Sequence, residues 1–241
     1  MYTFLLIIIA TRRGVYMTTC HVVAVIAEKG GVGKTTVSLS LAVAAMQAGY
    51  KVAVFDLDPQ ATAAQWTDRR EAEFPWVVAT PSIRLDAVLD NARKQGVNFV
   101  VIDTPPHAGS DAVEAVRRAD IVIVPMEPHL YTIETLPKLG DILKLAGDQP
   151  ALFVVSKAAT QGKEGMDAAT YIKEKGYNVC PVTLHLRAAH RHAGNLGLTA
   201  QEYEPKGKAA EESQQLYMYT IKLLTGKEYA HGKDESANTR A

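Results

Sequence analysis

Two lysines flank a glycine-rich run near the start of the chain, in a pattern that binds phosphate. The run reads KGGVGKTT and follows an apolar stretch that is predicted to be a strand. Glycines let backbone N–H groups turn inward around phosphate oxygens, and the start of the following helix adds a positive dipole end. In this pattern Lys34 reaches the β- and γ-phosphates and the Thr35 hydroxyl is a ligand for Mg²⁺. We therefore predict a nucleoside triphosphate site with contacts from Gly30, Gly31, Val32, Gly33, Lys34, Thr35 and Thr36.

Two further segments place carboxylates at the ends of predicted strands. One reads DLDPQ from Asp56 to Gln60, and the other reads FVVIDTPP with Asp103 as its acidic residue. Because the carboxyl ends of adjacent parallel strands meet at one crevice, we expect these carboxylates beside the phosphate loop. Asp103 is predicted to hold Mg²⁺ through its water shell. Each motif alone leaves an alternative open, since acidic residues at strand ends also end strands or cap the next helix.

Short apolar, β-branched runs alternate with helical patterns along most of the chain, and these elements must position the polar residues. The predicted strands are 22–27, 52–56, 99–103, 121–125, 151–156 and 178–182. The predicted helices are about 35–48, 61–73, 83–95, 111–118, 132–146, 164–175 and 208–224. This alternation is typical of βαβ units. We expect an α/β protein with the three-layer P-loop NTPase fold, a mostly parallel sheet flanked by helices on both faces.

The length of 241 residues fits one large domain better than two. We expect a single nucleotide-binding domain over 17–225, preceded by an extension or start-site artefact over 1–16 and followed by a polar flexible tail over 226–241. The apolar run from Phe4 to Ala10 is far shorter than the roughly 20 residues of a spanning helix. A membrane or partner anchor is the alternative interpretation of this segment.

Overall charge and cysteine usage exclude several classes of protein. Lys and Arg together number 26, and so do Asp and Glu, which gives a formal net charge of zero. A protein held constantly on nucleic acid by its overall charge is therefore not expected, although a local basic patch is compatible with this balance. Cys20 and Cys180 lie far apart and lack metal-ligand spacing, which indicates a reduced, cytoplasmic protein.

The segment AEKGGVGKTT resembles the deviant Walker A motif of the ParA/MinD family of ATPases. Glu28 stands where the usual P-loop pattern has its first glycine, and Lys29 follows it. In that family the extra lysine reaches across a sandwich dimer to the partner's nucleotide. Two lysines five residues apart are also too many for one nucleotide unless one points outward, and a cation supplied in trans acts like an arginine finger. The alternative is that Lys29 is only a solvated loop lysine.

The resemblance extends to the other motifs and implies further roles. DLDPQ is similar to the family's switch I, which implies that Asp58 positions or activates the attacking water and that Asp56 organises the metal shell. The expected catalytic residues are then Lys29, Lys34 and Asp58, and the expected metal site comprises Thr35, Asp56 and Asp103. The family also implies base contacts from Ser156 and Pro205, although many relatives have asparagine where Ser156 stands.

The chain looks most like the small ParA class of DNA-partition ATPases, which lacks an N-terminal helix-turn-helix domain. The implied protein is a Mg²⁺-dependent ATPase with a weak basal rate that forms a homodimer with ATP and binds DNA without sequence preference. A centromere-binding partner of the ParB type would stimulate hydrolysis during plasmid or chromosome segregation, in the cytoplasm on the nucleoid. The alternative is a relative that positions protein cargo, such as a microcompartment or a chemosensory cluster, on the nucleoid.

DNA binding needs a local basic surface, and one candidate follows the last predicted strand. Arg187 and Arg191 are four residues apart and share one face if LRAAHRHAG is helical, so we predict them as DNA contacts. An ordinary solvated face is the alternative. No membrane partner is expected, because the last sixteen residues lack the apolar stripe of a membrane-binding helix. Iron–sulfur relatives need paired cysteines, and a metabolic ligase would not need Lys29.

Overall fold

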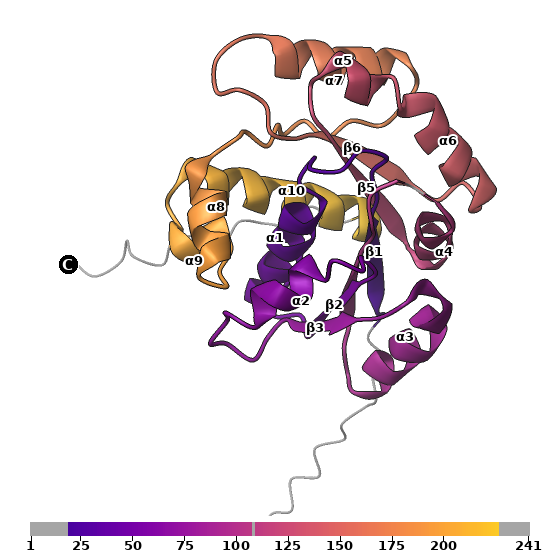
Figure 1. Cartoon of the computed structure of the whole chain (residues 1–241), viewed down its shortest axis with the longest axis vertical. Coiled ribbons are helices and arrows are strands. Elements are labelled where there is room, and N and C mark those ends of the chain that lie inside the picture. Colours follow the sequence, from indigo (N-terminus) through magenta and orange to yellow (C-terminus); the bar gives the residue numbers. More distant parts are fainter. Residues whose placement is uncertain (1–18, 108, 227–241) are drawn as a thin grey trace, which may run out of the picture.

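Six apolar segments form one parallel sheet in the order β3-β2-β4-β1-β5-β6 (Figure 1). The computed structural model describes residues 19–107 and 109–226. Its strands are β1 (His21–Val25), β2 (Val52–Asp56), β3 (Trp76–Ala79), β4 (Phe99–Asp103), β5 (Ile121–Met126) and β6 (Ala151–Val155). Five of them match predicted strands, and the prediction of a parallel α/β sheet is confirmed.

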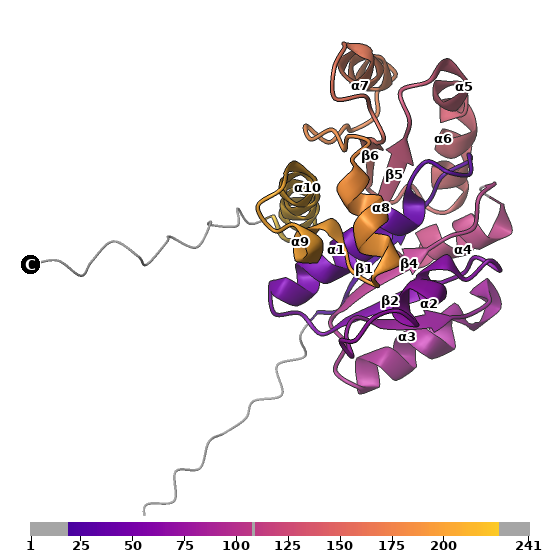
Figure 2. The same ribbon diagram turned by 60° about the vertical axis from the view of Figure 1, so that its left-hand side comes forward.

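Helices cover both faces of the sheet, because neighbouring residues of each buried strand point to opposite sides (Figure 2). One core lies against α3 (Leu85–Lys94), α4 (Ser110–Arg118), α6 (Leu136–Leu145) and α7 (Glu164–Glu174). The other lies against α1 (Lys34–Gln47), α2 (Thr62–Thr67) and α10 (Lys208–Thr225). The remaining helical segments are η1 (Ser82–Arg84), α5 (Leu130–Ile133), α8 (Ala188–Asn195) and α9 (Ala200–Tyr203). This is the expected three-layer arrangement.

Two strand predictions differ from the structure. The predicted strand 178–182 is reduced to one parallel bridge between Phe153 and Val179, because Pro181 has no N–H to continue the ladder. Strand β3 was not predicted, since its four residues follow Pro75 and are only partly buried. It forms the edge of the sheet beside β2.

Several helix boundaries also differ. The predicted helix 132–146 is two helices, α5 and α6, because Pro137 lies in the first turn of α6 and cannot continue a preceding helix. The predicted helix 61–73 ends at Thr67, where the chain turns toward β3. Helix α8 covers most of LRAAHRHAG but begins after Arg187, which is its N-cap residue with extended backbone angles. Arg187 and Arg191 therefore do not share a helical face.

The predicted extension over 1–16 lies outside the described residues, as does the predicted tail over 226–241 apart from Gly226. Within 19–107 and 109–226, no helix is both long and apolar enough to cross a membrane.

Candidate functional site

The phosphate loop joins β1 to α1 at the carboxyl edge of the sheet. Gly31 and Gly33 have φ values of +81° and +95°, a left-handed conformation that glycine adopts without steric cost. Gly33 is the N-cap of α1, and it gives that helix no side-chain cap. The first N–H groups of a helix without such a cap are free to bind an anion. The loop therefore has the backbone geometry of a phosphate cradle.

The two lysines of the loop differ in exposure. Lys34 is buried, and its Nζ lies 3.5 Å from the carbonyl oxygen of Lys29. Burial lowers the pKa of Lys34, and the charges of Asp103 and Asp58 oppose that effect. Lys29 is exposed, and its Nζ lies 5.8 Å from the centre of the Tyr131 ring. One lysine is thus enclosed beside the carboxylates, while the other is available at the surface.

Side chains from the β5 and β6 half of the sheet hold the loop in place. The Ser156 hydroxyl donates a 2.8 Å hydrogen bond to the carbonyl oxygen of Val32. The Lys157 ammonium donates to the carbonyl oxygen of Gly31. Lys138 on α6 forms an ion pair with Glu28. These contacts connect the loop to residues more than 100 positions later in the chain.

Sheet register places Asp56 and Asp103 opposite one another at the ends of β2 and β4. Asp103 is 1% exposed and accepts hydrogen bonds from the hydroxyls of Thr35, at 2.7 Å, and Ser38, at 2.9 Å. Burial raises the pKa of Asp103 to about 7, although the two hydroxyls and Lys34 act to lower it. The residue pair Thr35 and Asp103 is therefore brought together as predicted.

Asp56 makes contacts that match the helix-cap alternative. Its carboxylate accepts hydrogen bonds from the backbone N–H groups of Asp58, Ala63 and Ala64 at 3.0, 2.9 and 3.3 Å. Burial raises its pKa, and these donors act to lower it. Asp56 thus anchors the N-terminus of α2. Its role in the metal shell stays a prediction.

Asp58 is half-buried and lies in the turn between β2 and α2. Its Oδ1 accepts a 2.9 Å hydrogen bond from the Gln60 N–H, and its charge acts on Lys34. A carboxylate accepts hydrogen bonds through both oxygens, so Oδ2 can take a further partner. Asp58 is therefore placed near Lys34, the lysine predicted to bind phosphate, on a turn anchored by Asp56.

Thr35 and Asp103 fit a magnesium ion bound together with a nucleotide. Mg²⁺ prefers oxygen ligands, keeps several waters and uses one or two protein groups plus substrate phosphates. In the described part of the chain, no group of three or more His, Cys, Asp and Glu residues is arranged to hold a metal by itself. A hydroxyl and a carboxylate beside a phosphate cradle suit an ion that arrives with the phosphates. Mg²⁺ held by Thr35 and Asp103 would supply positive charge to neutralise the phosphates of the nucleotide.

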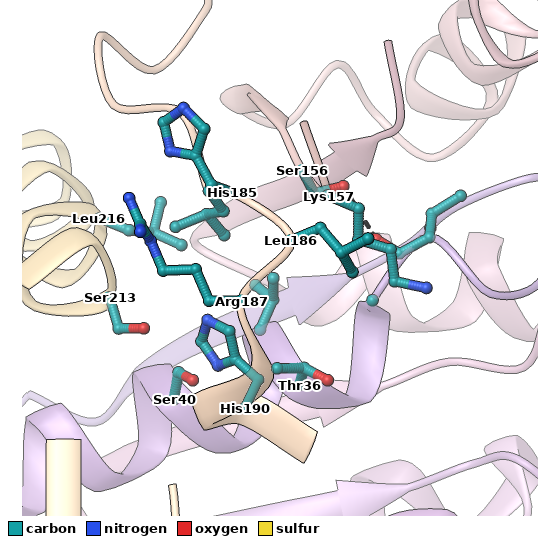
Figure 3. A pocket seen from close by; sticks show the side chains of 14 residues that line it. Thr36, Ser40, Ser156, Lys157, His185, Leu186, Arg187, His190, Ser213 and Leu216 are labelled. Atoms are coloured by element: carbon teal, nitrogen blue, oxygen red, sulfur yellow. Dashed lines mark hydrogen bonds between the residues drawn. The ribbon is translucent and has the colours of Figure 1, made fainter. Parts of the chain in front are cut away.

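A pocket opens directly beside the end of the phosphate loop (Figure 3). Gly33, Thr36 and Val37 form one side, and residues 184–187 form another. Ser156 and Lys157 from the end of β6 and Leu216 from α10 complete much of the lining. The position of the pocket beside the loop makes it the candidate site for the base of a nucleotide whose phosphates lie in the loop. The predicted base contact Ser156 lies in this pocket, but its hydroxyl already donates to Val32.

Pro205 is not part of this pocket. It lines a separate groove together with Gln47, the last residue of α1. The phosphate loop lies at the opposite end of α1, a helix about 20 Å long at 1.5 Å per residue. The expected contact between Pro205 and the base is therefore not supported by its position.

The two predicted DNA contacts lie in different surroundings. Arg187 lines the pocket beside the phosphate loop, and its guanidinium pairs with Glu212 at 2.6 Å. Arg191 is exposed and lines a neighbouring groove together with Arg69 and Trp66 of the α2 region. The structure thus keeps Arg191 at the surface and compensates the charge of Arg187.

Sequence reasoning missed Glu212. This residue is 8% exposed and lies four positions before Leu216, on the buried face of α10. An acidic residue on an otherwise apolar helical face predicts a buried partner. That signal was present in the sequence, but the partner was not identifiable there because it comes from a loop.

The comparison with protein families gives one match over most of the chain. Residues 23–200 match the model described as the CobQ/CobB/MinD/ParA nucleotide binding domain. This range includes the phosphate loop, both carboxylate motifs and the segment that forms α8.

Two curated relatives illustrate the range of similar proteins. The chain is 32% identical to maintenance of carboxysome distribution protein A from Gloeobacter kilaueensis, over 82% of this chain and 90% of the relative. It is 24% identical to sporulation initiation inhibitor protein Soj from Bacillus subtilis, over 79% of this chain and 94% of the relative.

Solved structures show the same fold. The septum site-determining protein MinD from Pyrococcus horikoshii, complexed with Mg-ADP, has a TM-score of 0.67 at 20% identity, covering 86% of this chain and 98% of that protein. The ATP complex of a Cyanothece McdA variant has a TM-score of 0.67 at 15% identity, covering 89% and 100%.

Proposed function

Because this chain belongs to the CobQ/CobB/MinD/ParA family of nucleotide-binding domains, we propose that it is a Mg²⁺-dependent ATPase that moves cargo on DNA as an ATP-dependent dimer. The observation that carries the proposal is the difference in burial between the two lysines of the loop. Lys34 is enclosed beside Asp103, and Lys29 is exposed. A buried lysine suits the nucleotide of its own subunit, and an exposed one suits the nucleotide of a second subunit.

The resting contacts of Lys29 are weak enough to be exchanged. Its ammonium lies over the exposed ring of Tyr131, and a cation–π contact at an exposed site is worth only about 0.5–1 kcal/mol. A γ-phosphate on a partner subunit offers a much stronger electrostatic contact in a water-excluded interface. Dimerisation therefore depends on ATP.

Hydrolysis is assigned to Asp58. It lies on the turn after β2, held by the contacts of Asp56 with the start of α2, and its charge acts on Lys34. A carboxylate in that position orients or activates the attacking water. The basal rate is weak, and a partner protein accelerates it and so opens the dimer.

Non-specific DNA binding is assigned to the exposed basic side chains at the surface around α8. Arg191 and Arg69 line the same groove, and both are exposed. The neutral chain as a whole binds DNA weakly, so two copies of the patch in one dimer are needed for useful avidity. DNA binding is then controlled by ATP.

We propose plasmid or chromosome DNA as the cargo, with a ParB-type partner that stimulates hydrolysis on the nucleoid. The second candidate is a protein cargo, and the observation that favours it is the 32% identity to the Gloeobacter carboxysome distribution protein. ATPase assays with DNA alone, and then with the protein encoded beside this gene, distinguish the two. Stimulation that requires a centromere-binding protein supports partition, and stimulation by a cargo-bound adaptor that binds no centromere supports the alternative.

The Lys29→Ala variant tests the dimer. We expect it to lose ATP-dependent dimerisation in analytical ultracentrifugation and to lose about 10³-fold or more in turnover, the scale of a cation supplied in trans. Lys144→Ala removes an exposed lysine from α6 and is the matched control. A Lys29→Ala protein that hydrolyses ATP normally as a monomer would overturn the sandwich dimer.

A further inference from the structure

The buried carboxylate of Glu212 fastens a loop segment to α10. It accepts hydrogen bonds from the His185 backbone N–H at 3.0 Å and the His185 ring at 2.8 Å. The Nε and Nη2 atoms of Arg187 donate to its Oε1 at 3.0 and 2.6 Å. Burial raises the pKa of Glu212, but the donors from Arg187 and His185 outweigh that effect, so the pKa is lowered overall. Glu212 is therefore an ionised, fully engaged group.

The same loop segment is held on its other side by backbone contacts to the end of β6. The Leu184 N–H donates to Val155 at 2.9 Å, and the Leu186 N–H donates to Ala158 at 2.9 Å. Ala158 and His185 form an isolated parallel bridge. Residues 184–187 are thus fixed between β6 and α10, with the Glu212 carboxylate as the attachment on the α10 side.

This fixed segment forms a wall of the pocket beside the phosphate loop. Leu184, Leu186 and Arg187 line the pocket on one side, and Gly33 and Thr36 line it on the other. Figure 3 shows the Arg187 side chain extending along this wall toward Leu216 and His185. Its side chain is only 25% exposed, and its charge is paired with Glu212. These surroundings suit a group that shapes a pocket better than a group that binds DNA phosphates.

We infer that Arg187 and Glu212 are a positioning pair for the nucleobase, and that Arg187 serves nucleotide binding instead of DNA binding. The inference rests on the proposed binding of ATP. A base that stacks against the 184–187 wall is held by shape and apolar contact, and the pair keeps that wall at the correct distance from the phosphate loop. Among the described residues, none that lines this pocket is acidic. The Glu212 carboxylate is engaged by Arg187 and His185, so it is not available to accept hydrogen bonds from guanine.

The test separates base binding from phosphate binding. Dissociation constants are measured in the presence of Mg²⁺ for two ligands, ATP and inorganic tripolyphosphate, which lacks a base. The proteins compared are the unmodified full chain, Arg187→Ala, Glu212→Gln and the double variant. We expect each single variant to weaken ATP binding by about 10- to 100-fold, the effect of an altered pocket contact, with little change for tripolyphosphate. The double variant should be no weaker than the single ones, because the residues act as a unit.

Arg191→Ala is the matched control, since it removes an exposed arginine one turn later from a neighbouring groove. It should leave both affinities unchanged and lower ATP-dependent retention on DNA. Arg187→Lys keeps a charged donor for Glu212 and should recover part of the ATP affinity, which also covers the case in which Arg187→Ala does not fold.

Two results would overturn the positioning pair. One is an Arg187→Ala protein with unchanged ATP affinity and reduced DNA retention. The other is an equal loss of ATP and tripolyphosphate binding, which indicates general disruption of the fold. If the unmodified chain itself binds no ATP, the proposed function fails instead, so the two failures are distinguishable.

Discussion

The phosphate-loop edge of the sheet and the region around α8 are built in different ways. At the sheet edge, the functional residues lie at or just after strand ends, so parallel register alone brings Asp56 opposite Asp103. Around α8, side chains are placed by polar contacts to other loops and helices and not by sheet register, as in the hydrogen bonds from Trp66 to Leu198 and from Arg69 to Gly194. The positions of the sheet-edge residues follow from local sequence patterns, and the positions of the residues around α8 follow from tertiary packing.

Because of this difference, we expect substitutions in the two regions to have different effects. The sheet edge holds the groups that we propose act on phosphates, so substitutions there should change chemistry more than stability. The α8 region holds a largely buried ion pair between Arg70 and Glu202 at 2.6 Å, so substitutions there should change stability more than chemistry. Three variants test that contrast, from the largest expected effect to the smallest.

The largest effect is expected at the sheet edge. Asp58→Ala should lower turnover by about 10²–10⁴-fold, the usual contribution of a positioned acid–base group, and should leave ATP binding and dimerisation intact. Single-turnover hydrolysis and a binding titration measure the two quantities. Failure of this variant to bind ATP would contradict the role of Asp58. It would also contradict the expectation that substitutions at the sheet edge act mainly on chemistry.

The next effect is expected in the α8 region. The Arg70 side chain is 1% exposed, so Arg70→Ala leaves Glu202 without its buried partner and should cost about 3 kcal/mol in the free energy of unfolding. Arg69→Ala, at the exposed neighbouring position, is the control and should cost less than about 1 kcal/mol. Urea denaturation measures both values. A large loss of turnover without loss of stability in Arg70→Ala would contradict the expectation that substitutions in the α8 region act mainly on stability.

The smallest effect is expected where the two regions meet. Ser156 donates to the Val32 carbonyl and also lines the base pocket. Ser156→Ala should destabilise the chain by about 1 kcal/mol, the usual value of one hydrogen bond, and should weaken ATP binding by less than about tenfold. Thermal unfolding with and without Mg-ATP measures both. A complete loss of ATP binding would show that this hydroxyl contacts the nucleotide directly.

Much of the fold was predictable because the strands are continuous apolar runs and the helices have regular apolar stripes. The main errors have local causes that periodicity does not report. Pro137 divides one predicted helix, and Pro181 stops a predicted strand. Strand β3 was not predicted, because an edge strand of four residues is too short to show a clear hydrophobic pattern.

The residues around the phosphate loop were predictable from the sequence. The surroundings of the residues predicted to contact the base or DNA were not. Thr35 and Asp103 meet as expected, because a strand end and a helix start are adjacent in any parallel sheet of this kind. Pro205 and Arg187 were assigned by resemblance and by spacing, and each lies in surroundings other than those expected. Loop positions depend on long-range contacts that short motifs do not contain.

The residue order alone was sufficient to identify the phosphate loop, its two lysines and the carboxylates, because glycine conformation and strand-end placement are local properties. Tertiary packing decided which lysine is enclosed, that Asp56 caps α2, and that Arg187 faces Glu212 instead of solvent. The physical reason is that burial and charge pairing depend on neighbours brought together by folding, and Glu212 lies 25 residues from Arg187 in the chain.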